Sequence, residues 1–153
     1  MADNKNNAKI CREVLLELLP RLHRQISRDL ADALRPHRMT PAQYSIVALL
    51  DTEGPLPPRR ISSALSLDQS TVVNTLNRLQ RDGFVSRHDD PDDGRSCLIK
   101  PTSEGQRIRK KCEKAVEGLM KDYSDNLSGS GWSKLLELVG KLEERLVRNA
   151  DPT

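Results

Sequence analysis

Aromatic side chains are scarce in this sequence, because Phe, Trp and Tyr together make up 3% of its 153 residues. Proteins that read single-stranded nucleic acids need exposed aromatic rings on which bases stack, so that class is disfavoured. A core must instead be built from Leu, Val, Ile and Ala. Together with 31% charged residues, this is typical of a mostly helical protein, and the length allows one domain plus a dimerisation region.

Long apolar runs are missing as well, since no segment approaches the ~20 apolar residues that span a bilayer. Residues 1–8 are polar and do not resemble a secretory signal. The cysteines Cys11, Cys97 and Cys112 are odd in number and far apart, which fits neither a disulfide framework nor a metal site. We therefore expect a cytoplasmic protein with no membrane partner.

The residue clusters that enzymes need are absent from the sequence. Three scattered histidines, no Gly-rich phosphate loop and no nucleophile elbow leave no catalytic constellation. No His, Cys or carboxylate cluster has the spacing of metal ligands. We expect a protein that is not an enzyme and that holds no metal and no cofactor.

Positive charge gathers in the middle of the chain. Residues 55–111 carry eleven Lys/Arg and seven Asp/Glu, whereas residues 112–153 carry six and eight. Binding to a polyanion favours such a distribution. From charge alone, a solvated surface whose asymmetry arose by chance explains this distribution as well as polyanion binding does.

Two long amphipathic segments flank this middle part. Over residues 8–36, apolar side chains recur every three or four residues, which predicts a helix with one apolar stripe and a kink or delayed start at Pro20. Residues 102–149 predict two further helices, separated by a flexible Ser-Gly linker at 128–131. These stripes are too long for one small lobe to bury.

Residues 40–101 form a lobe in this interpretation. Thr40, with Gln43 three residues later, predicts a capping box at the start of a short helix that ends near Leu50. Proline and glycine then break the chain, and a second short helix covers about 59–65.

A third helix follows a tight turn. Asp68 is placed to cap a helix over 69–81, and Gly83 to end it in the left-handed conformation. The side chains expected to face the core are Val72, Val73, Leu76 and Leu79.

A β-hairpin is predicted over residues 84–100, with an acidic turn-rich loop between its strands. Three short helices followed by a hairpin define a winged helix-turn-helix, in which the third helix enters the major groove of DNA. The predicted fold class is therefore mainly α with a small β-hairpin wing (α+β).

The outer face of the 69–81 helix offers short hydroxyls and amides that can donate and accept at base edges or phosphates. An ordinary polar surface is the alternative, and the hairpin that follows favours DNA binding. The candidate DNA-contacting side chains on this helix are Gln69, Ser70, Thr71, Asn74, Thr75 and Arg78.

The hairpin loop leaves two interpretations open. Arg95 at its tip can enter the narrow minor groove, with Asp93 orienting the guanidinium. Four acids between 89 and 93 would otherwise repel DNA. Either some of them pair with Arg87 and Arg95, or the hairpin does not touch DNA.

Residues 40–105 resemble the MarR family of multiple-antibiotic-resistance regulators. The resemblance rests on Thr40-Pro41-Ala42-Gln43-Tyr44, on the 67–73 and 79–85 segments, and above all on Asp90-Pro91-Asp92-Asp93-Gly94-Arg95 followed by Thr102-Ser103-Glu104-Gly105. Pro101 departs from the family, which usually has Leu there. We expect that departure to leave DNA contact unaffected.

This resemblance implies a homodimeric double-stranded DNA-binding regulator, expected to be a repressor that a small aromatic or anionic ligand releases from a pseudo-palindromic operator. The segments 8–36 and 102–149 would be dimerisation helices, with Trp132 as a dimer anchor. The resemblance places two groups of residues in the DNA contact: Ser70, Thr71, Asn74, Thr75 and Arg78 on the 69–81 helix, and the pair Asp93 and Arg95 in the hairpin loop. Gln69 and Arg87 are further candidates for DNA contact because of their positions on the helix face and beside the loop.

Other functions stay open at this level. His23 and His37 are candidates to line a ligand cleft, with Arg38 as an anion partner, although solvated or capping roles suit them too. Cys11 is a candidate oxidant sensor, because oxidant sensors of the family carry a cysteine near this position. A winged-helix protein-interaction module without DNA binding is the alternative from another class.

Overall fold

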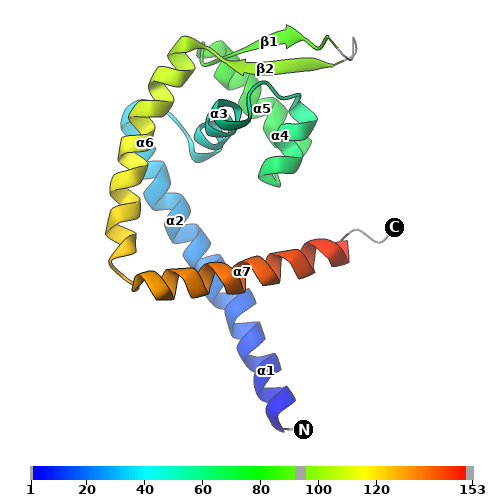
Figure 1. Ribbon diagram of the computed structural model, residues 1–153, viewed down its shortest axis with the longest axis vertical. Helices are drawn as coiled ribbons and strands as arrows, with labels where there is room; N and C mark the ends of the chain where they lie inside the picture. Colours follow the sequence, from blue (N-terminus) through cyan, green and yellow to red (C-terminus); the bar gives the residue numbers. More distant parts are fainter. Residues whose placement is uncertain (1, 92–95, 151–153) are drawn as a thin grey trace. The chain divides into compact units, whose positions relative to one another are not determined.

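The structure, a computed structural model, describes residues 2–91 and 96–150. Within these ranges the chain is mostly helical, with one two-stranded antiparallel sheet, so the predicted fold class is confirmed (Figure 1). The chain divides into two compact units, Met1–Val116 and Glu117–Thr153.

The winged lobe lies in the first unit, where three helices pack against one another and the strands of the hairpin contact all three (Figure 1). Its largest buried side chains, each at most 1% exposed, include Leu50, Ile61, Leu76, Leu79 and Ile99. The elements are α3 (Pro41–Glu53), α4 (Pro58–Leu65), α5 (Gln69–Arg81), β1 (Val85–Asp89) and β2 (Cys97–Pro101).

The predicted starts of α3 and α5 are confirmed by their caps, whereas α3 continues to Glu53 instead of ending near Leu50. The Thr40 hydroxyl accepts from the Gln43 N–H, and the Gln43 side chain accepts from the Thr40 N–H, which completes the capping box. Asp68 caps α5 by accepting from the Thr71 N–H at 2.8 Å. Gly83 ends that helix with a φ of 77°, which a side chain would disfavour.

The hairpin is anchored to the lobe through Ile99. β1 and β2 pair in an antiparallel register that sets Arg87 opposite Ile99. Leu56 adds a third, one-residue strand, because its N–H donates to the Ile99 carbonyl and its carbonyl accepts from the Ile99 N–H. The sequence did not predict this bridge, since Leu56 lies between Pro55 and Pro57 in a segment that breaks the helices.

The first helix is longer than predicted and contains a π-helical segment. It runs as α1 (Ala2–Arg12), η1 (Glu13–Leu18) and α2 (Leu19–Leu34). Pro20 has no N–H to bond one turn back, and the Leu19 N–H bonds to the Val14 carbonyl, five residues earlier. The helix thus continues through Pro20 with a shifted register, and a start delayed to Pro20 is wrong. A 3₁₀ turn, η2 (Arg35–His37), follows.

Helix α6 (Ser103–Ser124) is capped by Thr102, whose hydroxyl accepts from the Gly105 N–H and donates to the Gly83 carbonyl at 2.6 Å. Arg109 on α6 forms an ion pair with Asp51 of α3, with Nε and Oδ2 3.2 Å apart. Both contacts hold the first turns of α6 on the lobe.

Helix α7 (Gly129–Ala150) begins inside the segment predicted to be a flexible linker. Ser128 caps it, because its hydroxyl accepts from the Gly131 N–H at 3.2 Å. The prediction of a flexible linker at 128–131 is wrong, because a Ser-Gly segment can also begin a helix when the serine caps it, as Ser128 does.

Large apolar side chains remain exposed on the long helices, with exposed fractions between 37% and 76%. On the first helix they are Ile10, Leu16, Leu18, Leu19, Leu22 and Ile26, and on α7 they are Trp132, Leu135, Leu136, Leu138, Val139 and Leu146. Exposed apolar side chains gathered on one element in this way are typical of surfaces that contact another molecule.

Candidate nucleic-acid interface

The predicted recognition helix is α5, and most of its candidate side chains lie on its outer face. Gln69, Ser70, Asn74 and Arg78 are exposed, and Thr71 is half-buried. These side chains alternate with the buried residues that fix α5 to the lobe. The structure therefore brings these predicted residues together on one surface.

Thr75 does not belong to this surface, so the prediction that it lies on the outer face is wrong. Its side chain is 9% exposed, and its hydroxyl donates to the Thr71 carbonyl at 2.8 Å. Val73 shows the opposite error: predicted to face the core, it is 43% exposed. A threonine can face the core when its hydroxyl donates a hydrogen bond to a carbonyl of the same helix, as that of Thr75 does. Val73 then lies on the outer face.

Asp68 organises the N-terminal end of this surface. Its carboxylate accepts from the Ser70 hydroxyl at 2.5 Å, from the Thr71 hydroxyl at 2.6 Å and from the Thr71 N–H. The hydrogen bond from Ser70, followed by those from Thr71, lowers the pKa of Asp68 from 3.8 to about 2. Because the Ser70 and Thr71 hydroxyls both donate their protons to Asp68, their oxygens can only accept hydrogen bonds from another molecule.

Replacing Asp68 with Asn is expected to remove a pH-dependent contribution to stability while keeping the cap, because Asn also caps helices well. Since the folded-state pKa is lowered, this contribution is present above about pH 4 and is lost as the pH falls through about 2. Urea unfolding midpoints should show wild type above the variant near pH 5, with a much smaller difference near pH 2. An equal difference at both pH values would contradict this role of the charge.

Arg87 links the hairpin to α5. Its side chain is exposed on β1, and Nη2 donates to the Asn77 side chain of α5 at 2.8 Å. This bond holds the guanidinium beside the outer face of the recognition helix. Asp93 and Arg95, the predicted pair of the hairpin tip, lie outside the described residues.

Two cations on the preceding helix are absent from the residues predicted from the sequence. Arg59 and Arg60 occupy the first turn of α4 and are both exposed. The first helix of a helix-turn-helix crosses the DNA backbone, so these side chains are candidates for phosphate contacts. Two adjacent arginines at the start of the predicted 59–65 helix were the signal that could have found them.

The candidate ligand residues are not brought to one site. His23 lines an open hollow on α2 with Arg24, Ser27 and Arg28. His37 and Arg38 lie about 20 Å further along the axis of the same helix and its 3₁₀ extension, at 1.5 Å per residue. Within one chain His23 therefore lies apart from His37 and Arg38, and a ligand cleft lined by these residues stays a prediction.

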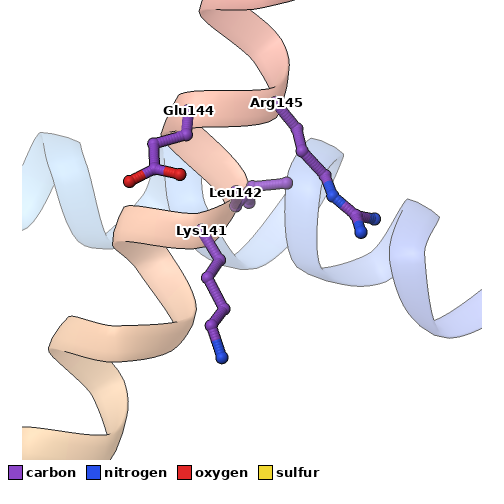
Figure 2. A pocket seen from close by; sticks show the side chains of 4 residues that line it. All are labelled: Lys141, Leu142, Glu144 and Arg145. Carbon is purple, nitrogen blue, oxygen red and sulfur yellow. The ribbon is translucent and has the colours of Figure 1, made fainter.

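Other surface features offer no assembled chemistry. Figure 2 shows a hollow on α7 lined by Lys141, Leu142, Glu144 and Arg145, all from one helix. In the part of the chain that the structure describes, no three His, Cys, Asp or Glu side chains gather to hold a metal ion. Nor is any helix there apolar and long enough to cross a bilayer.

The cysteines occupy three different environments. Cys11 is exposed on α1, Cys97 is half-buried on β2, and Cys112 is fully buried on α6. Burial raises the pKa of the Cys112 thiol, which keeps it protonated and inert. Cys112 therefore serves in core packing. The oxidant-sensing alternative depends on the exposed thiol of Cys11.

An outward polar helix supported by two short helices and a β-hairpin defines a winged helix-turn-helix protein. Residues 39–97 match the model of the MarR family. The HTH-type transcriptional regulator YwoH of Bacillus subtilis, itself uncharacterized, is 31% identical over 106 residues, which are 67% of this chain and 77% of that protein. The chain belongs to the MarR family, and it is a DNA-binding transcriptional regulator.

One further relative bears on the site, through both its sequence and a solved structure. The multiple antibiotic resistance protein MarR of Escherichia coli is 27% identical over 126 residues, which cover 82% of this chain and 88% of that protein. A crystal structure of a cysteine-to-serine mutant of E. coli MarR in complex with operator DNA has a TM-score of 0.80 and 26% identity. That match covers 86% of this chain and 96% of the other.

Proposed function

We propose that this protein is a homodimeric repressor that binds a pseudo-palindromic operator, with α5 of each protomer in the major groove. The observation that carries the proposal is the outer face of α5, where Gln69, Ser70, Asn74 and Arg78 lie together and Arg87 is held beside them. The similarity to a MarR structure in complex with operator DNA supports it.

The exposed apolar stripes support the homodimer. The stripe on α1, η1 and α2 and the stripe on α7 expose twelve large apolar side chains, two of them more than 60% exposed. A second copy of the same chain can cover both stripes, since interfaces of dimers that form permanently are as apolar as a divided core. A two-fold dimer would then present two α5 helices to two half-sites.

We also propose that a small aromatic or anionic ligand releases the repressor from DNA. The hollow on α2 supports an anionic ligand, because Arg24 and Arg28 place two cations beside His23 and Ser27. Binding there would act on the long helix that precedes the DNA-binding lobe.

Arg78→Ala is the variant that tests the DNA-binding surface. Because Arg78 is exposed on the outer face of α5, we expect its loss to weaken binding to the selected duplex by ~1–3 kcal/mol. If Arg78 contacts a phosphate, the slope of log K against log salt should also become shallower by about 1. Fluorescence anisotropy at several salt concentrations measures both quantities.

The duplex for this test comes from genomic fragments that the wild-type protein selects at two salt concentrations. Lys134→Ala is a matched control, because it removes one cation from α7, where Lys134 pairs with Glu137, and should leave affinity within twofold. Salt-insensitive or undetectable binding by wild type would contradict the proposed function and favour a protein-interaction module.

A further inference from the structure

The outer face of α5 carries one apolar side chain in a polar setting. Val73 is 43% exposed, and its neighbours three and four residues away on the helix include Gln69, Ser70 and Asn77. A β-branched side chain at an exposed helical position adds nothing to the stability of the helix. On a helix that binds DNA, such a side chain can contact an apolar group of the DNA.

In the major groove that apolar group is the C5-methyl of thymine. An aliphatic side chain that projects from the recognition helix toward the base edges can pack against this methyl group. Because both groups are apolar, the contact buries no hydrogen-bond donor or acceptor. A valine between polar neighbours therefore distinguishes thymine from the other three bases.

Ser70 restricts the choice further. Its hydroxyl proton is directed to Asp68, with the two oxygens 2.5 Å apart, so the oxygen presents lone pairs to a partner. The groups that donate hydrogen bonds in the major groove are the amino groups of adenine and cytosine. Among base pairs with such a donor, only A·T also carries a methyl group.

We propose that Val73 and Ser70 make α5 selective for A·T base pairs, with Val73 against the thymine methyl and the Ser70 oxygen accepting from the adenine amino group. The proposal rests on the proposed function, because it requires α5 to lie in the major groove. It adds the identity of the bases that the helix reads.

The test replaces thymine with uracil, which removes the methyl group and keeps base pairing. Each thymine of the selected duplex is replaced in turn, and binding is measured by fluorescence anisotropy. We expect one thymine per half-site at which uracil weakens wild-type binding about fourfold, the value of one buried methyl group. Val73→Ala should bind thymine and uracil equally at that position, and Val73→Ile should keep the discrimination.

A second arm tests Ser70. Replacing adenine with purine, which lacks the amino group, should weaken wild-type binding at one position per half-site and leave Ser70→Ala unaffected there. If no thymine is sensitive to uracil, or if Val73→Ala stays as sensitive as wild type, the base assignment is overturned. Absence of salt-dependent binding to any selected fragment would instead overturn the proposed function.

Discussion

Gly105→Ala is expected to lower the free energy of unfolding by about 2–3 kcal/mol, as overpacking of a buried site does. A Cβ at position 105 would lie 2.0 Å from the carbonyl oxygen of Phe84, and that neighbour is backbone rather than a flexible side chain. The same carbonyl accepts from the Thr102 N–H at 3.0 Å. Relief of the clash must therefore shift α6 away from the end of α5 and weaken the Thr102 cap.

Gly118→Ala provides the matched control on the same helix. No atom lies within 4 Å of the position where its Cβ would stand, and the residue is exposed. Alanine at a helical position is more stable than glycine by about 0.5–1 kcal/mol, so this variant should be neutral or more stable. Chemical unfolding of both variants and wild type measures the contrast. Equal effects of the two substitutions would mean that the close approach of α6 to Phe84 does not matter for stability.

The helices of the winged lobe could be predicted from the sequence, because the residues that begin and end them act locally. A threonine followed three residues later by glutamine, an aspartate before a polar helix, and a glycine after it each satisfy backbone groups within a few residues. Such signals need no knowledge of the rest of the chain, and all three caps are present in the structure. The bridge from Leu56 to Ile99 joins segments far apart in sequence, which is why no local signal predicted it.

The site was less predictable, because its chemistry depends on which way each side chain turns. The helical period from Val72 places position 75 inward and position 73 outward, but the polarity of the two side chains favours the opposite assignment. The hydrogen bond from the Thr75 hydroxyl to the Thr71 carbonyl is what lets a threonine occupy the inward position. The acceptor character of Ser70 depends on its bond to Asp68. An aspartate two and three residues before hydroxyl side chains is a sequence pattern that could have indicated it.

Leu136→Asp is expected to convert the proposed dimer into monomers and to abolish operator binding at concentrations where wild type is saturated. Leu136 is 76% exposed on α7, within the apolar stripe that a second copy would cover. In a two-fold interface each substitution occurs twice, and an unpaired buried carboxylate costs several kcal/mol. The dissociation constant of the dimer should therefore rise by two orders of magnitude or more.

Lys141→Gln is the control that separates the effect of the charge change from the effect of placing a carboxylate on the apolar stripe. It lowers the charge of each chain by one, as Leu136→Asp does, but Lys141 lies on the polar side of α7, where it pairs with Glu137. This control should remain a dimer and bind DNA as wild type does. Analytical ultracentrifugation gives the oligomeric state, and anisotropy with the selected duplex gives the affinity. A dimeric Leu136→Asp protein with wild-type affinity would contradict a dimer interface on this stripe. Loss of dimerisation with full DNA binding would show instead that a single lobe suffices for the operator.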